Sequence, residues 1–261
     1  MLPWTIVLLL SVGVFLLLRK IAKHKEIHKQ QGLFKAWPIK KVSVDELDPI
    51  FTPNQFGPTR DAMVHFLGAS NLVVPGGASD SESWILSVLA KKSKNIFEFG
   101  TCTGKTTYLM AINAPEDASV TTLTLAPDQL GMYSKEKTDS TISTNDALVE
   151  SGFTSFLYSD TAEERKITQL FMDSKMLNET TYANKMDLIF IDGSHAYSYV
   201  MSDTKKALKM LAPGGILLWH DYRGRHRTAD VFRALNFLAK ELPLRHIKGT
   251  SLVAYRKPQS L

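Results

Sequence analysis

Short apolar runs recur along the chain from residue 95 onward, and each is rich in β-branched or aromatic residues. Between them lie stretches whose apolar side chains have helical spacing. This alternation predicts an α/β fold in which a doubly wound, mostly parallel sheet carries helices on both faces. The predicted strands are residues 95–99, 120–125, 167–171, 187–191 and 215–219, and the predicted helices include 79–92, 104–113, 143–151, 197–211 and 228–241.

The two ends of this region carry further local signals. Residues 244–256 contain two strand-like runs on either side of Lys248 and Gly249, which is typical of a terminal antiparallel hairpin. At the other end, the helix over residues 79–92 is expected to have Asp80 or Ser81 as its N-cap. The hydrophobic pattern alone therefore outlines one domain from its first helix to its last strand.

The N-terminal segment has a different pattern. Residues 2–18 contain no charged side chain, and a helix of that length is about 25 Å long, near the lower limit for crossing a bilayer. Basic residues follow from Arg19. The positive-inside rule then predicts a single-pass transmembrane anchor over residues 1–20, with the rest of the chain on the cytoplasmic side. A cleaved signal peptide fits less well, because no basic residue precedes the run and no small-x-small site follows it.

The anchor and the domain are separated by a segment of mixed character. Residues 21–60 are first basic and then contain four prolines, so we expect a juxtamembrane segment followed by a linker that wraps onto the domain. The catalytic domain is expected over residues 61–261.

Composition narrows the class of protein. With 261 residues, 44% hydrophobic and 22% charged, the chain is long enough for one α/β domain with an extension. Its net charge of +5 comes partly from the basic residues after the apolar run, so nucleic acid is not expected as a partner. The single cysteine, Cys102, excludes an intrachain disulfide and favours a reducing compartment. The oligomeric state is not indicated.

A glycine-containing turn follows the first predicted strand. In residues 98–107, EFGTCTGKTT, Gly100 and Gly104 would let the backbone approach a ligand at a helix N-terminus. A P-loop needs one more residue between its glycines, and a dinucleotide site needs G-x-G-x-x-G. The acid-x-G-x-x-x-G pattern resembles motif I of class I methyltransferases, which bind S-adenosylmethionine (SAM). A tight turn without a ligand remains the alternative.

Ionisable side chains follow two later strands at the same edge of the predicted sheet. Asp192 and His195 come after the strand at 187–191, and His220 and Asp221 come after 215–219. Ligands bind at the carboxyl ends of strands in such sheets. Carboxylates and imidazoles suit a divalent ion such as Mg²⁺ or Mn²⁺, and an imidazole suits proton abstraction near neutral pH.

The same stretch strengthens the resemblance. Residues 187–222 resemble the I-D-G-x-H-x-Y-x-x-V-x-x-D…L-x-x-G-G-x-x-x-x-H-D-Y pattern of a class I subgroup that includes macrocin-type sugar O-methyltransferases and cephalosporin-hydroxylase-like proteins. This implies a Rossmann-like fold, Asp192 and Asp221 as metal ligands, and His195 as general base. The sugar enzymes have Glu where this chain has His220. We count His220 as a third candidate ligand, and whether a metal binds stays open.

The resemblance also implies contacts to SAM. Two of them depart from a simple match. Thr124 stands where class I enzymes usually carry an acid for the ribose hydroxyls, and a hydroxyl binds these more weakly than a carboxylate. Asp173 corresponds to the residue that binds the adenine amino group, but it can equally cap a loop. The candidate cofactor-binding residues are Glu98, Gly100, Thr101, Gly104, Thr124 and Asp173.

The sequence therefore predicts a membrane-anchored, SAM-dependent O-methyltransferase that acts on a small-molecule, sugar or lipid-linked acceptor. The basic run at 223–227 can bind an anionic acceptor or form a solvated loop. An NAD-dependent oxidoreductase is disfavoured, because Thr107 and Thr124 replace the glycine and the acid it needs. A membrane-tethered Rossmann-like module without methyl transfer activity remains the alternative.

Overall fold

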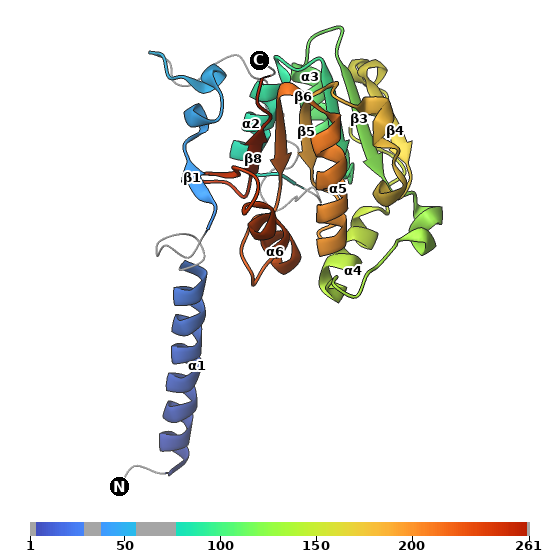
Figure 1. Cartoon of the computed structure of the whole chain (residues 1–261). Coiled ribbons are helices and arrows are strands. Elements are labelled where there is room, and N and C mark those ends of the chain that lie inside the picture. Colours follow the sequence, from blue (N-terminus) through green and yellow to red (C-terminus); the bar gives the residue numbers. More distant parts are fainter. Residues whose placement is uncertain (1–3, 29–37, 56–76, 260–261) are drawn as a thin grey trace.

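The computed structural model describes residues 4–28, 38–55 and 77–259, and its described strands form one eight-stranded sheet (Figure 1). The strands are β1 (Lys40–Val42), β2 (Asn95–Phe99), β3 (Ser119–Thr124), β4 (Ile167–Phe171), β5 (Met186–Ile191), β6 (Leu211–Trp219), β7 (Arg245–Ile247) and β8 (Val253–Arg256). The α-helices are α1 (Trp4–His28), α2 (Asp80–Ala90), α3 (Lys105–Asn113), α4 (Thr141–Glu150), α5 (Tyr197–Met210) and α6 (Ala229–Leu238). Short 3₁₀ helices are η2 (Val44–Glu46), η3 (Pro49–Phe51), η4 (Pro127–Met132), η5 (Ala162–Lys166), η6 (Ser174–Met176) and η7 (Glu179–Tyr182).

The strand order is β1-β7-β8-β6-β5-β2-β3-β4. Strands β4, β3, β2, β5 and β6 are mutually parallel, and β8 runs antiparallel to both β6 and β7. The predicted doubly wound sheet and its C-terminal antiparallel hairpin are confirmed. The chain order reverses between β2 and β5, where Phe99 is paired with Ile191. In open sheets of this kind, ligands bind outside the carboxyl ends of the strands at such a reversal.

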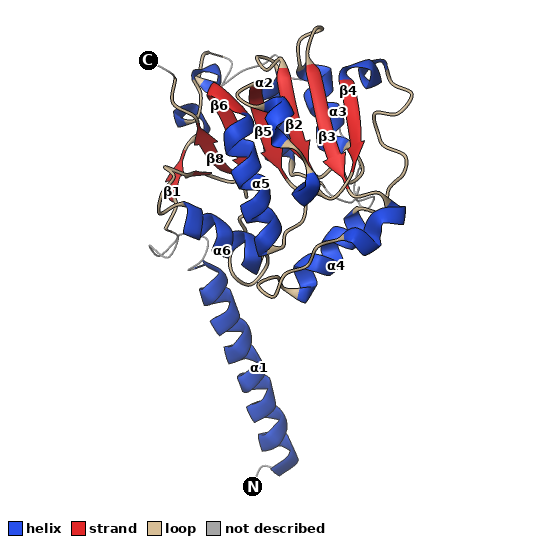
Figure 2. Cartoon of the chain, turned by 45° about the vertical axis from the view of Figure 1, so that its right-hand side comes forward, coloured by secondary structure: helices blue, strands red, loops and turns tan. Residues whose placement is uncertain are grey.

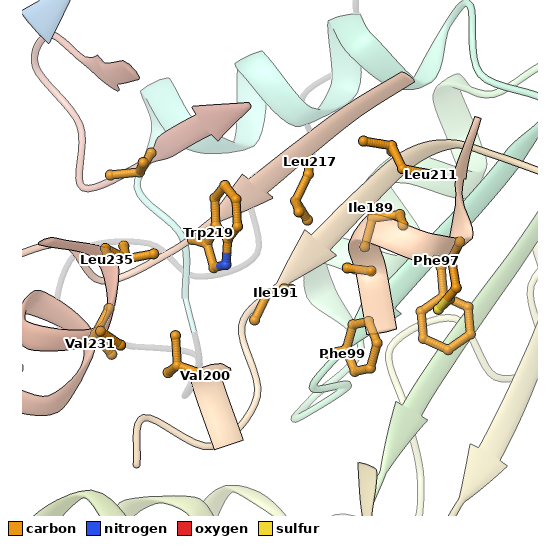
Figure 3. Close-up of a cluster of buried hydrophobic side chains, with 14 of the residues drawn as sticks. Phe97, Phe99, Ile189, Ile191, Val200, Leu211, Leu217, Trp219, Val231 and Leu235 are labelled. Atoms are coloured by element: carbon orange, nitrogen blue, oxygen red, sulfur yellow. The ribbon is translucent and has the colours of Figure 1, made fainter. Parts of the chain in front are cut away.

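Alternating side chains of the strands build a hydrophobic core on each face. On one face, Phe97, Ile189 and Trp219 pack against α5 and α6 (Figure 3). On the other, Ile96 and Leu188 pack against α2 and α3. Because both faces are covered, the central strands are mostly apolar on both sides, and this produced the short apolar runs in the sequence. Helix α4 lies at the carboxyl edge of the sheet instead of on a face (Figure 2).

The segment expected as a linker contributes to the sheet. Strand β1 pairs in parallel with β7, with Lys40 opposite Arg245. Just after it, Phe51 is fully buried against the edge of Trp84. The sequence did not predict this strand, because three residues reading KKV carry too little hydrophobic pattern to distinguish a strand from a loop.

Helix α1 runs through the apolar N-terminal segment into the basic residues that follow it. Among the described residues, no helix combines the length and the hydropathy needed to cross a membrane. The transmembrane helix expected over residues 1–20 is therefore not supported by the structure.

The start of α2 differs by one residue from the expectation. Its N-cap is Ser79, neither Asp80 nor Ser81. The Ser79 hydroxyl accepts a hydrogen bond from the Glu82 backbone N–H, and the Glu82 carboxylate accepts from the Ser79 backbone N–H at 2.8 Å. This reciprocal pair is a capping box, and it fixes the position of the Glu82 side chain beside the carboxyl edge of the sheet.

Candidate active site

The turn between β2 and α3 passes directly over the start of the β5 loop. Gly100 has φ 102°, and a Cβ atom there would lie 2.2 Å from the backbone oxygen of Asp192. Glycine is the one residue type that fits, because it has no Cβ and tolerates this φ value. The next turn residue, Cys102, also has a positive φ, 45°. The close approach at Gly100 is thus to the backbone of Asp192, and it brings the two strand ends together; the predicted approach to a ligand stays a prediction.

Gly104 serves a different purpose from the one expected. It has φ 79° where α3 begins, and a Cβ atom would lie 2.8 Å from Cε1 of Tyr158. The close neighbour is thus a packed aromatic ring of this chain. Gly104 belongs to the turn and to the packing beneath it, and it does not line either of the two clefts described below.

Glu98 points away from the carboxyl edge into a buried cluster of threonines. Its carboxylate accepts hydrogen bonds from the hydroxyls of Thr106 at 2.5 Å, of Thr122 at 2.7 Å, and of Thr107. Thr101 joins the cluster through its hydroxyl, 2.8 Å from that of Thr122. Burial raises the pKa of Glu98 to about 7, against the lowering effect of the hydroxyls. The carboxylate holds the turn in place. It does not line either cleft, although the sequence named Glu98 as a candidate cofactor-binding residue.

A first cleft, with an empty volume of about 530 Å³, opens beside Gly100 at the ends of β3, β4 and β5. Thr124 and Asp173 line it, as expected from the sequence. Asp173 also caps η6: it accepts from the Lys175 backbone N–H at 2.9 Å and from the Tyr199 hydroxyl at 2.8 Å. Asp173 is thus a cap that also lines the cleft, and its contact with the adenine amino group stays a prediction. The remaining walls are mostly apolar or aromatic, from Phe99, Leu123, Leu125, Tyr133, Ala147 and Met172.

A second cleft, of about 570 Å³, lies on the other side of the turn and is polar. His195, Asp221 and Arg223 line it. The two clefts share four wall residues, which are Gly100, Cys102, Glu150 and Asp192. The clefts therefore adjoin at the reversal point of the sheet, one with mainly apolar walls and one with charged walls.

The second cleft contains an ionic cluster centred on Asp221. His195 Nε2 lies 2.9 Å from Asp221 Oδ2, and Arg223 Nε lies 2.7 Å from Oδ1. Burial lowers the pKa of His195, but the hydrogen bond and charge of Asp221 outweigh it and raise the pKa to about 9. Asp221 itself has φ 61°, an unusual conformation for a residue other than glycine. Such strain is found where the surroundings force a functional side chain into position.

His220 is buried behind this cluster. Its Nδ1 lies 2.8 Å from Oδ1 of Asp192, and its Nε2 lies 3.3 Å from Oε2 of Glu82. Burial lowers the pKa of His220, but the charges and hydrogen bonds of Asp192 and Glu82 raise it well above its usual value. His220 lines the second cleft, but both of its ring nitrogens face carboxylates and it is not one of the three converging donors, so its role as a metal ligand stays a prediction. It supports Asp192 from behind.

The donors that converge are Asp192, His195 and Asp221. One ligand atom from each lies within 4.8 Å of the others. Oδ1 of Asp221 is buried and, among the described residues, makes no hydrogen bond, although Arg223 lies close. Two carboxylates and one imidazole fit a divalent ion such as Mg²⁺ or Mn²⁺. Compared with the set expected from the sequence, His195 takes the place of His220.

Three acids at the site were missed or misplaced by sequence reasoning. Glu82 is 3% exposed and holds His220, and the S-x-x-E spacing of its capping box was the available signal. Glu150 lines both clefts from the end of α4, and no motif marks it. Asp203 falls in a predicted helix, where an acid is usually a surface charge, yet it is 1% exposed and lines the first cleft. Burial raises its pKa to about 7.

Comparison with known proteins agrees with this geometry. A protein-family model described as a methyltransferase domain matches residues 97–222. These residues run from β2 to just past β6 and include the turn, both strand ends and the ionic cluster. This is a class I methyltransferase domain. The resemblance predicted from the sequence is confirmed, and so is the enzyme class.

Solved structures of similar architecture include three methyltransferases. The O-methyltransferase TomG from Streptomyces achromogenes, involved in tomaymycin synthesis and solved with SAM, is 16% identical over 69% of this chain and 82% of its own, with a TM-score of 0.48. The Podospora anserina methyltransferase PaMTH1, bound to S-adenosylhomocysteine (SAH), is 13% identical over 71% and 81%, with a TM-score of 0.49. A Bacillus cereus O-methyltransferase with SAH is 16% identical over 70% and 84%, with a TM-score of 0.47. A search of curated proteins finds no significant match.

Proposed function

We propose that this protein is a SAM-dependent O-methyltransferase whose first cleft binds SAM and whose second cleft binds the acceptor. The observation that carries the proposal is that the two clefts meet at Gly100, Cys102, Glu150 and Asp192 within a methyltransferase domain. Methyl transfer needs donor and acceptor in line and in contact, and adjoining clefts permit this. The alternative of a tethered module without activity leaves the ionic cluster of the second cleft without a purpose.

The lining of the first cleft supports SAM as its ligand. Leu123, Leu125 and Met172 offer apolar surface for a purine. Thr124 offers a hydroxyl for the ribose. Oδ1 of Asp203 is buried and has no hydrogen-bond partner among the described residues, so a donor group of the ligand would satisfy it.

The ionic cluster supports chemistry on an acceptor hydroxyl. His195 in its neutral form removes the hydroxyl proton, the oxygen forms a bond to the methyl carbon, and the carbon–sulfur bond breaks with its electron pair passing to sulfur. Because the pKa of His195 is raised to about 9, the neutral form becomes more populated as the pH rises toward 9. The products are the methyl ether, SAH and a protonated His195. Asp221 holds His195 at 2.9 Å and orients it for this step. Asp192 lines both clefts and orients the acceptor at their junction.

A divalent ion is a second part of the proposal. Asp192, His195 and Asp221 would hold it, and when bound it would supply Lewis-acid polarisation of an oxygen in place of proton abstraction by His195. The partly exposed Arg223 faces the same cleft and favours an acceptor that carries negative charge. A sugar, a lipid-linked sugar or another small molecule with an anionic group has the required chemistry.

The first experiment is calorimetric titration of SAM into the full chain, followed by a screen for transfer of a labelled methyl group to sugars and lipid-linked glycans. We expect micromolar binding and transfer to an anionic acceptor. His195→Ala should abolish most turnover, whereas His226→Ala, an exposed histidine of the neighbouring loop, should not. Folded protein that binds no SAM would refute the proposal.

We further propose that α1 attaches the enzyme to a membrane, with the domain on the cytoplasmic side. The support is the charge-free run of residues 2–18, the basic residues after it, and the apolar side chains that α1 exposes, such as Phe15 at 63% and Leu17 at 60%. Fractionation of cells tests this. Recovery of the full chain in the soluble fraction without detergent would contradict it.

A further inference from the structure

The junction of the two clefts is where the transferred methyl group has to lie. If SAM fills the first cleft and the acceptor fills the second, the sulfonium must sit at the wall that both clefts share. Four residues form that wall, so they are the neighbours of the reacting sulfur. This position of the sulfonium rests on the proposed function. The four residues differ in charge.

One of the four is an ionisable residue without a partner among the described residues. Gly100 has no side chain, and burial raises the pKa of the Cys102 thiol to about 12, so it is neutral near pH 7. Asp192 is bonded to His220 at 2.8 Å. Glu150 differs, because among the described residues no side chain donates a hydrogen bond to it or forms an ion pair with it. It is half-buried at the end of α4, directed to both clefts.

We propose that the Glu150 carboxylate faces the sulfonium of bound SAM and makes the site bind SAM in preference to SAH. SAM carries a positive charge on sulfur, whereas SAH, after the methyl group has left, has a neutral thioether. A carboxylate at this point attracts the sulfonium of SAM, whereas the neutral sulfur of SAH offers no charge to attract. It therefore favours the replacement of the product SAH by a new molecule of SAM.

The surroundings of Glu150 strengthen this attraction. Burial raises its pKa to about 7, with Asp192 and Asp221 adding to the rise and His195 opposing it. An ionised carboxylate that is poorly solvated gains more from an incoming cation than an exposed one does. The arriving sulfonium therefore supplies the partner that the chain itself does not.

Titration calorimetry with SAM and with SAH on the full chain tests the proposal. In the wild type we expect tighter binding of SAM. Glu150→Gln should weaken SAM binding about tenfold and change SAH binding less than about twofold. Asp146→Asn is the matched control, because it removes an exposed acid one turn earlier on α4, and it should change neither affinity.

Sinefungin, which carries an ammonium in place of the methyl sulfonium, provides a test on the wild type alone. It should bind more tightly than SAH if a carboxylate faces that position. Equal loss of SAM and SAH affinity in Glu150→Gln, or equal affinity of the wild type for sinefungin and SAH, would overturn the proposal. If neither SAM nor SAH binds the wild type, the proposed function fails and this inference fails with it.

Discussion

Asp192 Oδ1 and His220 Nδ1 lie 2.8 Å apart, at the ends of two adjacent strands, and the histidine is buried. The pair links the wall of both clefts to Glu82, which in turn accepts hydrogen bonds from the backbone N–H and hydroxyl of Ser251 at 2.6 and 2.7 Å. Three separate parts of the chain, the end of β5, helix α2 and the loop before β8, are thus linked to one imidazole that follows β6. We regard His220 as a positioning residue for Asp192.

Removal of this imidazole should cost stability as well as activity. His220→Asn leaves two buried carboxylates without their shared partner, and we expect the free energy of unfolding to fall by about 3 kcal/mol. Urea denaturation measures it. His226→Asn, in the exposed loop, should change it by less than about 0.5 kcal/mol. If the free energy of unfolding falls as little in His220→Asn as in the control, the His220 imidazole does not hold Asp192.

A second prediction concerns the turn between β2 and α3. Gly100→Ala places a Cβ atom 2.2 Å from the Asp192 backbone oxygen at φ 102°, so the two strand ends must separate. We expect a stability loss of about 3 kcal/mol and loss of SAM binding. Gly131→Ala is the matched control, because nothing lies within 4 Å of the added atom. Thermal unfolding and SAM titration measure both effects. Unchanged SAM affinity in Gly100→Ala would separate this turn from the cofactor.

The sequence predicted the fold well because the central strands are buried on both faces. Runs such as residues 188–191 are apolar at every position there, and this signal is local. Strand β1 was missed because its pairing with β7 depends on residues about 200 positions away. The sequence of a three-residue edge strand does not by itself determine the register of its pairing.

The candidate site was predicted in its location but not in the direction of each side chain. Asp192, His195 and Asp221 converge as expected, since strand ends share one edge. Glu98 lines neither cleft, because three threonine hydroxyls hold its carboxylate, and His220 lines the second cleft while its ring nitrogens face Asp192 and Glu82. Glu150 could not be predicted, since it reaches the clefts from a helix outside the strand-end motifs. The sequence motifs thus identify the carboxyl edge of the sheet as the site, whereas tertiary packing determines which side chains line the clefts.

The donor set makes a third prediction. Mn²⁺ or Mg²⁺ should raise the thermal unfolding temperature of the full chain by a few degrees, since the ion binds the folded state alone. Asp221→Asn should abolish the rise, because it weakens one of three ligands. Asp128→Asn, an exposed acid on η4, should keep it. A rise of the same size in both variants would place the ion elsewhere, and no rise in the wild type would show that the cluster works without a metal.

Glu98 makes the fourth prediction, which concerns the pH dependence of stability. Its pKa in the folded chain is about 7, raised by burial above the value of about 4.3 expected when unfolded. The folded state therefore binds the proton more tightly, so the stabilisation is complete below about pH 4 and is lost as the pH rises through about 7. Relative to Glu98→Gln, which does not titrate, the wild type should lose about 3 kcal/mol between about pH 4 and about pH 8. Urea denaturation across this range measures the difference. The control variant Glu241→Gln, at an exposed position, should show the same pH dependence of stability as the wild type. If the stability of Glu98→Gln changes with pH in parallel with that of the wild type, the threonine hydroxyls hold Glu98 ionised at every pH.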